Sequence, residues 1–140
     1  MEFHPNGSLA TTHKTQGSDM GLFGGFLGWD ATDPRLAEST RALQEAGIRV
    51  EIRITEYPAP HPNTYRMTLS GPSGRHTATA VSTGGGMVEV LEVDGARLSM
   101  AGDYFETLIW VEEDGAGEDR PRSLAGELAS TPETEEVFVH

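Results

Sequence analysis

Apolar and charged residues alternate without interruption over residues 48–54, with the apolar residue at every even position. A side-chain period of two is typical of a β-strand that buries one face and exposes the other to water. Weaker strand character is present at residues 8–14. Similar patterns predict the later strands, which are expected at residues 65–69, 75–81, 87–93, 97–100, 107–111 and 136–139.

Two turn signals connect neighbouring strands of this series. Pro72-Ser73-Gly74 separates the strands at 65–69 and 75–81, and Asp94-Gly95 separates those at 87–93 and 97–100. Asp-Gly is a strong signal for a two-residue hairpin. The middle of the chain is therefore expected to form an antiparallel meander.

The clearest helix signal covers residues 34–46. Asp33 provides an N-cap, Pro34 suits the first helical position, and Gly47 suits the position after the last turn. A short helix is also predicted at residues 123–129.

A further helix is predicted from Ser18, taken as its N-cap, to Leu27. Gly21, Gly24 and Gly25 would each weaken it by about 1 kcal/mol relative to alanine. Glycines in such a helix usually allow close packing, here of a strand or of a ligand.

These elements predict an α+β fold with a mostly antiparallel sheet and helices packed on one face. We expect a main domain at residues 1–112. Residues 113–140 are expected to form an acidic linker, a short helix and a strand, and residues 113–122 read as the linker itself.

The chain is acidic, with 22 Asp and Glu against 10 Lys and Arg and a net charge of −12. Nucleic acid is an unfavourable partner for such a surface, because phosphate binding needs a basic face. No apolar run has the length of a signal peptide or of a membrane span. The composition therefore predicts a cytoplasmic protein that binds neither nucleic acid nor membrane.

Two segments rich in turn-forming residues bracket the hairpin that spans residues 65–81. His61 and Asn63 flank a proline, which presents an imidazole and a carboxamide from one rigid turn. Gly84, Gly85 and Gly86 leave backbone N–H groups unshielded and can curl into a cavity that accepts an anion. If both segments lie at the same end of the hairpin, they predict a pocket for a small polar acid; the alternative is that both are only turns.

Other chemistry has weak support. The 140 residues contain no cysteine, so they supply neither thiolate ligands nor thiol nucleophiles, and they cannot hold an iron–sulfur cluster by themselves. No histidine pair has the spacing of a helical metal site, and none is expected to bind metal. Neither a Gly-x-Ser-x-Gly motif nor a phosphate-binding loop motif is present.

The order of motifs over residues 6–93 resembles the β domain of iron–sulfur-dependent bacterial L-serine dehydratase. The segments that carry the resemblance are Gly7-Ser8-Leu9-Ala10, Thr15-Gln16-Gly17-Ser18-Asp19, Gly24-Gly25-Phe26-Leu27-Gly28, Asp33-Pro34-Arg35, Ala59-Pro60-His61-Pro62-Asn63-Thr64 and Ser82-Thr83-Gly84-Gly85-Gly86. Residues 98–109 look like the exit into the family's ACT regulatory domain. The Gly-His-Gly-Thr-Asp motif of the family lacks its histidine here, its N-terminal Gly-Pro-Ser-Ser-Ser-His-Thr segment is absent, and the ACT-like tail is truncated.

The resemblance implies an allosteric-substrate-binding type of fold that works with a partner subunit. In the family, that partner carries a [4Fe–4S] cluster and converts L-serine to pyruvate and ammonia. For this chain the resemblance implies no cofactor of its own and a pocket for a small amino or hydroxy acid. The implied binding residues are His61, Asn63, Gly84, Gly85, Gly86, Gly17 and Ser18, with Asp19 beside them.

An alternative is a stand-alone lyase, isomerase or cyclase of a biosynthetic pathway that uses His61 or Asp19 for acid–base catalysis. A dimeric scaffold with a vestigial pocket is a third possibility. We expect the chain to form a homo-oligomer.

Overall fold

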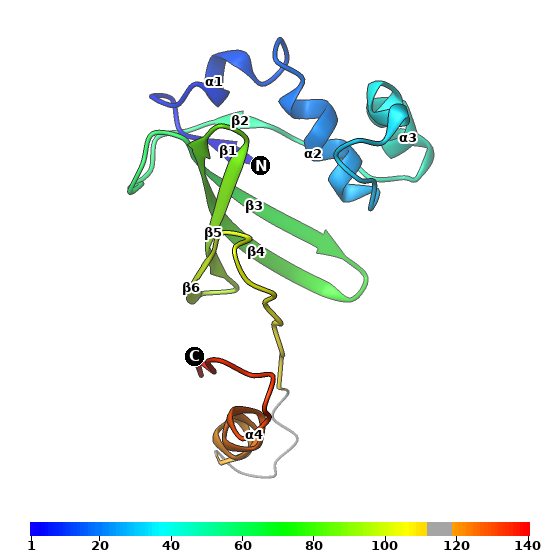
Figure 1. Ribbon diagram of the computed structural model, residues 1–140. Helices are drawn as coiled ribbons and strands as arrows, with labels where there is room; N and C mark the ends of the chain where they lie inside the picture. The colour runs from blue at the N-terminus through cyan, green and yellow to red at the C-terminus, as the bar shows by residue number, and fades with distance from the viewer. Residues whose placement is uncertain (112–118) are drawn as a thin grey trace. The chain divides into compact units, whose positions relative to one another are not determined.

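A computed structural model describes residues 1–111 and 119–140 and shows an α+β architecture, as predicted (Figure 1). Its sheet has six strands in the order β2-β1-β3-β4-β5-β6, and only the β1–β2 pair is parallel. The elements are β1 Glu2–Phe3, α1 Leu9–Thr12, α2 Ser18–Phe26, the 3-10 helix η1 Pro34–Glu38, α3 Ser39–Glu45, β2 Arg53–Ile54, β3 Thr64–Gly71, β4 Gly74–Gly84, β5 Met87–Val93, β6 Ala96–Met100 and α4 Arg120–Ala129.

The meander of strands β3 to β6 confirms the predicted hairpins. β3 and β4 pair in register from Thr64↔Val81 to Gly71↔Gly74, around the predicted turn. At the β5–β6 turn, Asp94 and Gly95 have φ values of 50° and 88°. Two successive residues with positive φ are the hallmark of the turn that matches the twist of a tight hairpin.

The long strand predicted at residues 48–54 is mostly wrong. Only β2 pairs with the sheet, through the Arg53 N–H to the Met1 carbonyl at 2.8 Å and the Thr55 N–H to the Phe3 carbonyl at 3.0 Å. Because its partner β1 is two residues long, the ladder ends there. The even-numbered face is not buried, since Ile48 and Ile54 are 39% and 46% exposed.

The N-terminal region differs from the strand predicted at residues 8–14. The chain forms the short strand β1, which was not predicted, and then the single-turn helix α1. The Thr11 and Thr12 hydroxyls both donate to the Ser8 carbonyl, at 3.2 and 2.7 Å. These local bonds favour a helical turn over a strand ladder, a competition that alternation alone does not reveal.

Helix α2 confirms the predicted glycine-containing helix, with one correction at its start. The N-cap is Gly17, which has a φ of 76°, and Ser18 is the first helical residue. Within the helix, a Cβ on Gly24 would lie 2.3 Å from Leu36 Cδ2. This glycine therefore allows a protein side chain to approach, as the packing interpretation predicted.

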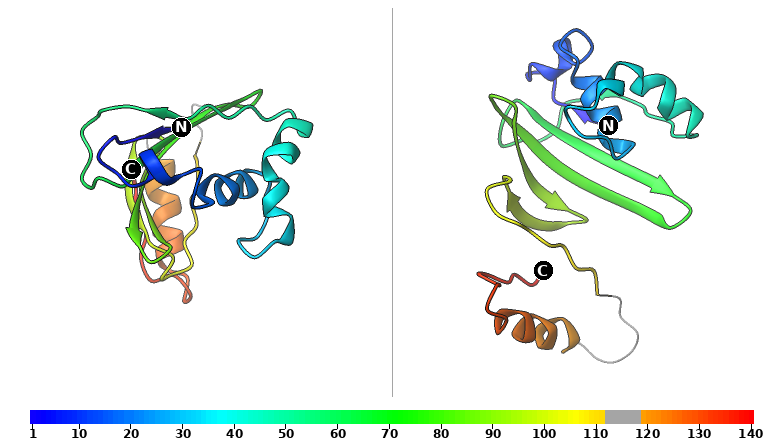
Figure 2. Two further views of the ribbon diagram at one scale, coloured as in Figure 1. Left: turned by 90° about the horizontal axis from the view of Figure 1, so that it is seen from above. Right: turned by 45° about the vertical axis from the view of Figure 1, so that its right-hand side comes forward.

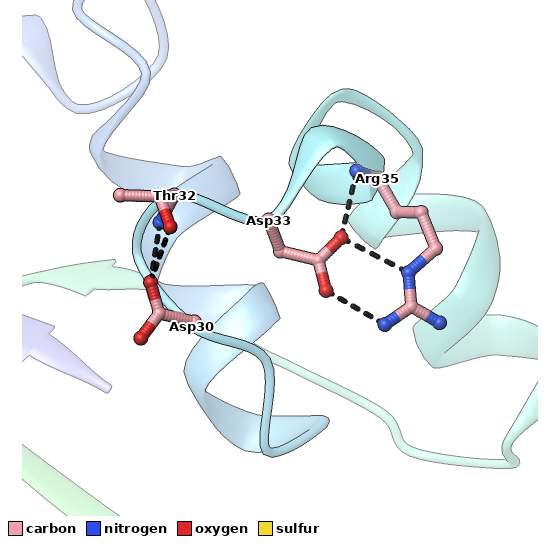
Figure 3. A network of polar contacts seen from close by, with 4 residues as sticks. All are labelled: Asp30, Thr32, Asp33 and Arg35. Carbon is pink, nitrogen blue, oxygen red and sulfur yellow. Dashed lines mark hydrogen bonds and ion pairs between the residues drawn. The ribbon is translucent and has the colours of Figure 1, made fainter.

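The helix predicted at 34–46 forms as two consecutive pieces, η1 and α3. Its start is as expected: the Asp33 carboxylate accepts hydrogen bonds from the Arg35 backbone N–H at 2.9 Å and from the Arg35 Nη2 at 2.6 Å (Figure 3). These bonds lower the pKa of Asp33 to about 2. The Arg35 guanidinium also lies 4.6 Å from the centre of the Trp29 ring. Gly47 follows α3 with a φ of 72°.

Helices α1, α2 and α3 lie on the same side of the sheet, with α1 nearest to β1 and β2 and α3 at the far end of α2 (Figures 1 and 2). The buried apolar side chains of the described residues come from several elements, and they are Phe3, Leu43, Tyr57, Ala80 and Val81. Thr64 is also buried, and its hydroxyl donates to the His61 carbonyl at 2.7 Å. The core therefore includes the start of β3, next to the predicted pocket.

By its internal contacts the chain divides into residues 1–102 and 103–140. In the second unit, α4 contains the predicted helix at 123–129 and extends it to Arg120. Neither residues 107–111 nor 136–139 form the predicted strands, because no described segment offers them a ladder partner. The predicted domain boundary after residue 112 and most of the predicted linker lie outside the described residues.

Among the described residues, no helix combines the length and the apolar character required to cross a membrane.

Candidate functional site

The two segments of the predicted pocket lie at the same end of the β3–β4 hairpin. Thr64 pairs with Val81, and the Ser82 N–H donates to the Asn63 carbonyl at 3.1 Å. The Gly84–Gly86 turn starts two residues after Ser82. The pairing of β3 with β4 therefore meets the condition stated for the predicted pocket, that both segments lie at the same end of the hairpin.

His61 stands in a turn whose geometry its own ring helps to fix. The Asn63 backbone N–H donates to His61 Nδ1 at 3.1 Å. Because Nδ1 accepts this bond, the proton of a neutral imidazole lies on Nε2, which becomes a donor. The residue is exposed, so this edge of the ring is accessible to a ligand.

Asn63 has a structural role that the sequence did not indicate. Its side-chain Oδ1 accepts from the Ser8 N–H at 2.8 Å and from the Ser8 hydroxyl at 3.1 Å. Gly7 comes so close that a Cβ there would lie 2.3 Å from the Pro62 carbonyl oxygen. The carboxamide oxygen therefore joins the start of α1 to the His61 turn, and only its amino group is left for a ligand.

The Gly84–Gly86 turn has the backbone that an anion-accepting bend requires. The three glycines have φ values of 100°, 63° and 84°, which residues with a Cβ rarely adopt. They are exposed, and a Cβ on any of them would meet no atom within 4 Å. The space beside this backbone is therefore open on the described part of the chain.

At the start of α2, Asp19 contacts a histidine. Its Oδ1 lies 2.7 Å from His13 Nδ1, and the Asp19 backbone N–H donates to the His13 carbonyl at 3.2 Å. The His13 side chain is only 11% exposed and packs against the Phe3 ring, with 5.3 Å between ring centres. An ionised carboxylate accepts only, so Nδ1 carries the proton and Nε2 is the basic nitrogen.

Sequence reasoning assigned no role to His13 or to Tyr57. The Tyr57 hydroxyl donates to the Thr64 carbonyl at 2.8 Å, and burial raises the pKa of this phenol. Arg66 stacks 4.2 Å above the Tyr57 ring. For His13, the sequence offers only one indication of a role, which is the presence of Asp19 six residues later. This interval is not a contact distance within a helix or a strand.

Two of the three predicted site segments, His61–Asn63 and Gly17–Asp19, lie at opposite ends of α1. Ser8, at the start of this helix, contacts Asn63, whereas His13 follows its end and contacts Asp19. Four helical residues rise about 6 Å, so the groups are near but separate. No described hydrogen bond joins Gly84–Gly86 to either group. The binding roles of all these residues, Gly17 and Ser18 included, remain predictions.

The side chains of this chain do not suit an iron–sulfur cluster as ligands. The 140 residues contain no cysteine, and within residues 1–111 and 119–140 no three His, Asp or Glu side chains converge as metal ligands would. What the arrangement offers is hydrogen-bond donors, a histidine–carboxylate pair and an open glycine turn.

Comparison with known proteins finds two curated relatives. Over 103 residues the chain is 34% identical to a protein of Bacillus subtilis named "Probable L-serine dehydratase, beta chain", with 74% of this chain and 47% of that protein covered. Over 111 residues it is 31% identical to the "L-serine dehydratase, beta chain" of Peptoniphilus asaccharolyticus, with 78% and 50% covered. The chain thus spans about half the length of the curated relatives it matches.

No family model and no solved structure matches the chain. The motifs over residues 6–93 resemble the family that both relatives' names give, and these relatives cover about three quarters of the chain. Over that part of its length, this chain is a homologue of L-serine dehydratase beta chains.

Proposed function

We propose that this chain is a β-subunit-like module that binds L-serine, or a similar small amino or hydroxy acid, for an L-serine ammonia-lyase. The observation that carries the proposal is the similarity to two proteins named as beta chains of L-serine dehydratase. In this role the chain contributes to the conversion of serine to pyruvate and ammonia without performing the dehydration alone.

The geometry at the end of the β3–β4 hairpin supports a site for an amino acid. The exposed His61 Nε2 and the Asn63 amino group are donors, and the Gly84–Gly86 backbone is unshielded. A carboxylate needs such a set of N–H donors, and backbone bends with positive φ commonly provide them. The Gly17–Ser18 start of α2 is a second place that favours a carboxylate.

The partner in this proposal is a second chain that carries the [4Fe–4S] cluster. The cluster supplies the Lewis acid for removal of the serine hydroxyl. This chain has no thiolate to hold it, so its own share is limited to binding and orienting the acid.

Titration of the isotope-labelled chain with L-serine, followed by NMR, tests the binding role. We expect resonances of residues 61–63 and 84–86 to shift in a saturable way. His61→Ala should weaken binding by about tenfold, the effect of one lost hydrogen bond to a charged group. His140→Ala, which removes another exposed imidazole, should leave binding unchanged.

Absence of any saturable shift at millimolar L-serine would contradict binding by this chain alone. The partner is tested separately by co-purification: a cysteine-containing chain should accompany this one, and the complex should form pyruvate from L-serine. If the complex forms pyruvate although the single chain binds no serine, the pocket is completed by the partner.

A second candidate function is favoured by the His13–Asp19 pair. A carboxylate that orients an imidazole is the usual arrangement of a general base, so a stand-alone lyase, isomerase or cyclase has a base on this chain. The isolated chain should then turn over a small acid. His13→Gln and Asp19→Asn should both abolish that turnover while the fold, checked by circular dichroism, persists.

A further inference from the structure

Asn63 uses nearly all of its polar groups to hold its own turn. Its backbone N–H donates to His61 Nδ1 at 3.1 Å, and its backbone carbonyl accepts from the Ser82 N–H at 3.1 Å. Its side-chain Oδ1 accepts two hydrogen bonds from Ser8, at 2.8 and 3.1 Å. Within residues 1–111 and 119–140, its amino group at Nδ2 has no hydrogen-bond partner. The side chain therefore offers a ligand a donor and no acceptor.

Ser8 fixes the orientation of this carboxamide. A backbone N–H can only donate, so the atom that lies 2.8 Å from the Ser8 nitrogen has to be the amide oxygen. The Ser8 hydroxyl donates to the same oxygen. Turning the amide over would break both bonds and would set its amino group against the Ser8 N–H, donor against donor. Ser8 thus keeps the amino group of Asn63 turned away from itself.

Ser8 can reach the carboxamide because the residue before it is a glycine. A Cβ on Gly7 would lie 2.3 Å from the Pro62 carbonyl oxygen and 3.0 Å from Asn63 Oδ1. A side chain at this position would push the two segments apart. The contact that orients the amide therefore depends on Gly7.

The chain contains a second His-Pro-Asn sequence, which shows what is specific to the first. At residues 4–6, the Asn6 N–H also donates to the histidine Nδ1, at 3.3 Å. The Asn6 side chain, however, has no hydrogen bond to any described residue. The bond to the histidine ring is thus common to both turns, whereas the oriented carboxamide is found only in the turn at residues 61–63.

The His61 ring has the same polarity as the carboxamide. Its Nδ1 accepts the Asn63 N–H, so a neutral ring carries its proton on Nε2, and a protonated ring carries one there as well. Nε2 is therefore a donor in both states. These two side chains can bind the oxygens of a carboxylate, but they offer an ammonium group no acceptor.

We propose that Ser8 is the positioning residue of a site at the 61–63 turn that binds a small acid by its carboxylate and does not contact its amino group. The ligand class is small carboxylates, with or without an α-amino group. The role of Ser8 rests on the proposed function, because this turn is the one proposed to bind L-serine. What it adds is that an acid without nitrogen binds there as well as L-serine does.

Two probes that each keep part of L-serine test this selection in the full chain. The first, 3-hydroxypropionate, lacks the amino group, and the second, L-serine methyl ester, lacks the free carboxylate. NMR titrations are followed at the side-chain signals of Asn63 Nδ2 and His61 Nε2. The affinity for 3-hydroxypropionate should be within about threefold of that for L-serine, and the ester should bind about tenfold more weakly.

Two variants with the same change of net charge separate the turn from general electrostatics. Asn63→Asp keeps an oxygen for Ser8 and replaces the amino group by a second carboxylate oxygen. It should weaken binding of 3-hydroxypropionate by about tenfold or more and reverse the preference, so that the ester binds better. Gln44→Glu adds the same charge at an exposed position of α3 and should keep the preference.

The role of Ser8 is tested first without a ligand, by the NMR coupling across its hydrogen bond from the Ser8 backbone nitrogen to the Asn63 side-chain carbonyl carbon. This coupling should be present in the full chain. Ser8→Ala should reduce it and weaken binding of 3-hydroxypropionate by about threefold, because an amide held by one bond spends part of its time turned over. Ser8→Thr keeps the hydroxyl and should restore both values.

The outcomes distinguish this site from the proposed function. Binding of L-serine without binding of 3-hydroxypropionate would overturn the carboxylate site and leave the proposed function standing, whereas the reverse result would contradict serine binding alone. Absence of binding by either acid at millimolar concentration would overturn both. An unchanged preference in Asn63→Asp would overturn the carboxylate site. A missing coupling, or an affinity that Ser8→Thr does not restore, would overturn the role of Ser8.

Discussion

At the scale of single residues, Asn63 and Asp33 each stabilise a turn through hydrogen bonds that their side chains accept. Asn63 Oδ1 accepts two hydrogen bonds from Ser8, which lies 55 positions away in the sequence. Asp33 accepts three from Arg35, two positions away. The first contact depends on tertiary structure, whereas the second follows from local sequence.

Asn63→Ala should lower the free energy of unfolding by about 1–2 kcal/mol, because the Ser8 N–H and hydroxyl both lose their acceptor. Urea denaturation followed by circular dichroism measures the change. Asn63→Asp keeps an acceptor oxygen at the same place and should cost less. Equal losses in both variants would mean that the bonds to Ser8 are not what stabilises the turn.

The ion pair of Asp33 predicts a specific pH dependence. Its carboxyl pKa is lowered from 3.8 to about 2, first by the side-chain hydrogen bond of Arg35 and then by the Arg35 backbone N–H. A depressed folded-state pKa stabilises the fold above the unfolded value, so this contribution is complete above about pH 4 and is lost as the pH falls through about 2.

NMR titration of the Asp33 side-chain carbonyl measures this pKa directly. In Arg35→Ala the value should move upward, toward 3.8, because the largest cause of the shift is removed. Glu38→Ala removes a different acidic group of the same segment and should leave the Asp33 value in place. A low Asp33 pKa that survives in Arg35→Ala would contradict the assigned cause.

At the scale of elements, the three glycines within helix α2 have different surroundings. A Cβ on Gly21 or Gly25 would meet nothing within 4 Å, whereas a Cβ on Gly24 would lie 2.3 Å from Leu36 Cδ2. None of the three has a positive φ. Two of them therefore have no packing role within the described structure, while the third sets the distance between α2 and η1.

Gly21→Ala and Gly25→Ala should each raise the free energy of unfolding by about 1 kcal/mol, because alanine is the better helix former and no clash opposes it. Gly24→Ala should fail to stabilise, since Leu36 has to move. Thermal denaturation of the three variants gives the order. Destabilisation by Gly25→Ala would reveal an occupant of that helix face, such as a partner chain.

At the scale of the whole molecule, the division after Gly102 separates two units of different character. Residues 1–102 contain the sheet, the helices α1, α2, η1 and α3, and all the buried apolar residues among those described. Residues 103–140 contain one helix and no buried apolar side chain among those described. Stability is therefore expected to reside in the first unit.

Truncation after Gly102 should leave the fold of the first unit intact. The two-dimensional amide NMR spectrum of residues 1–102 should superimpose on the corresponding signals of the full chain, with an unfolding midpoint within a few degrees. Wide loss of dispersed signals would show that the second unit contributes to the core. Such a result would also favour a single domain across the division.

The sequence alone determined the meander of β3 to β6 and the cap of η1, because period-two patterns, Asp-Gly turns and Asp-Pro starts act locally. The order of its motifs also carried the resemblance to a serine dehydratase β domain. Tertiary structure decided the rest. The strand at 48–54 shrank to β2 because a strand extends only as far as its partner. Residues 107–111 and 136–139 belong to no strand of the described sheet. Likewise, Ser8 with Asn63 and His13 with Asp19 became pairs only when the chain folded, since residues at these separations do not contact each other within a single helix or strand.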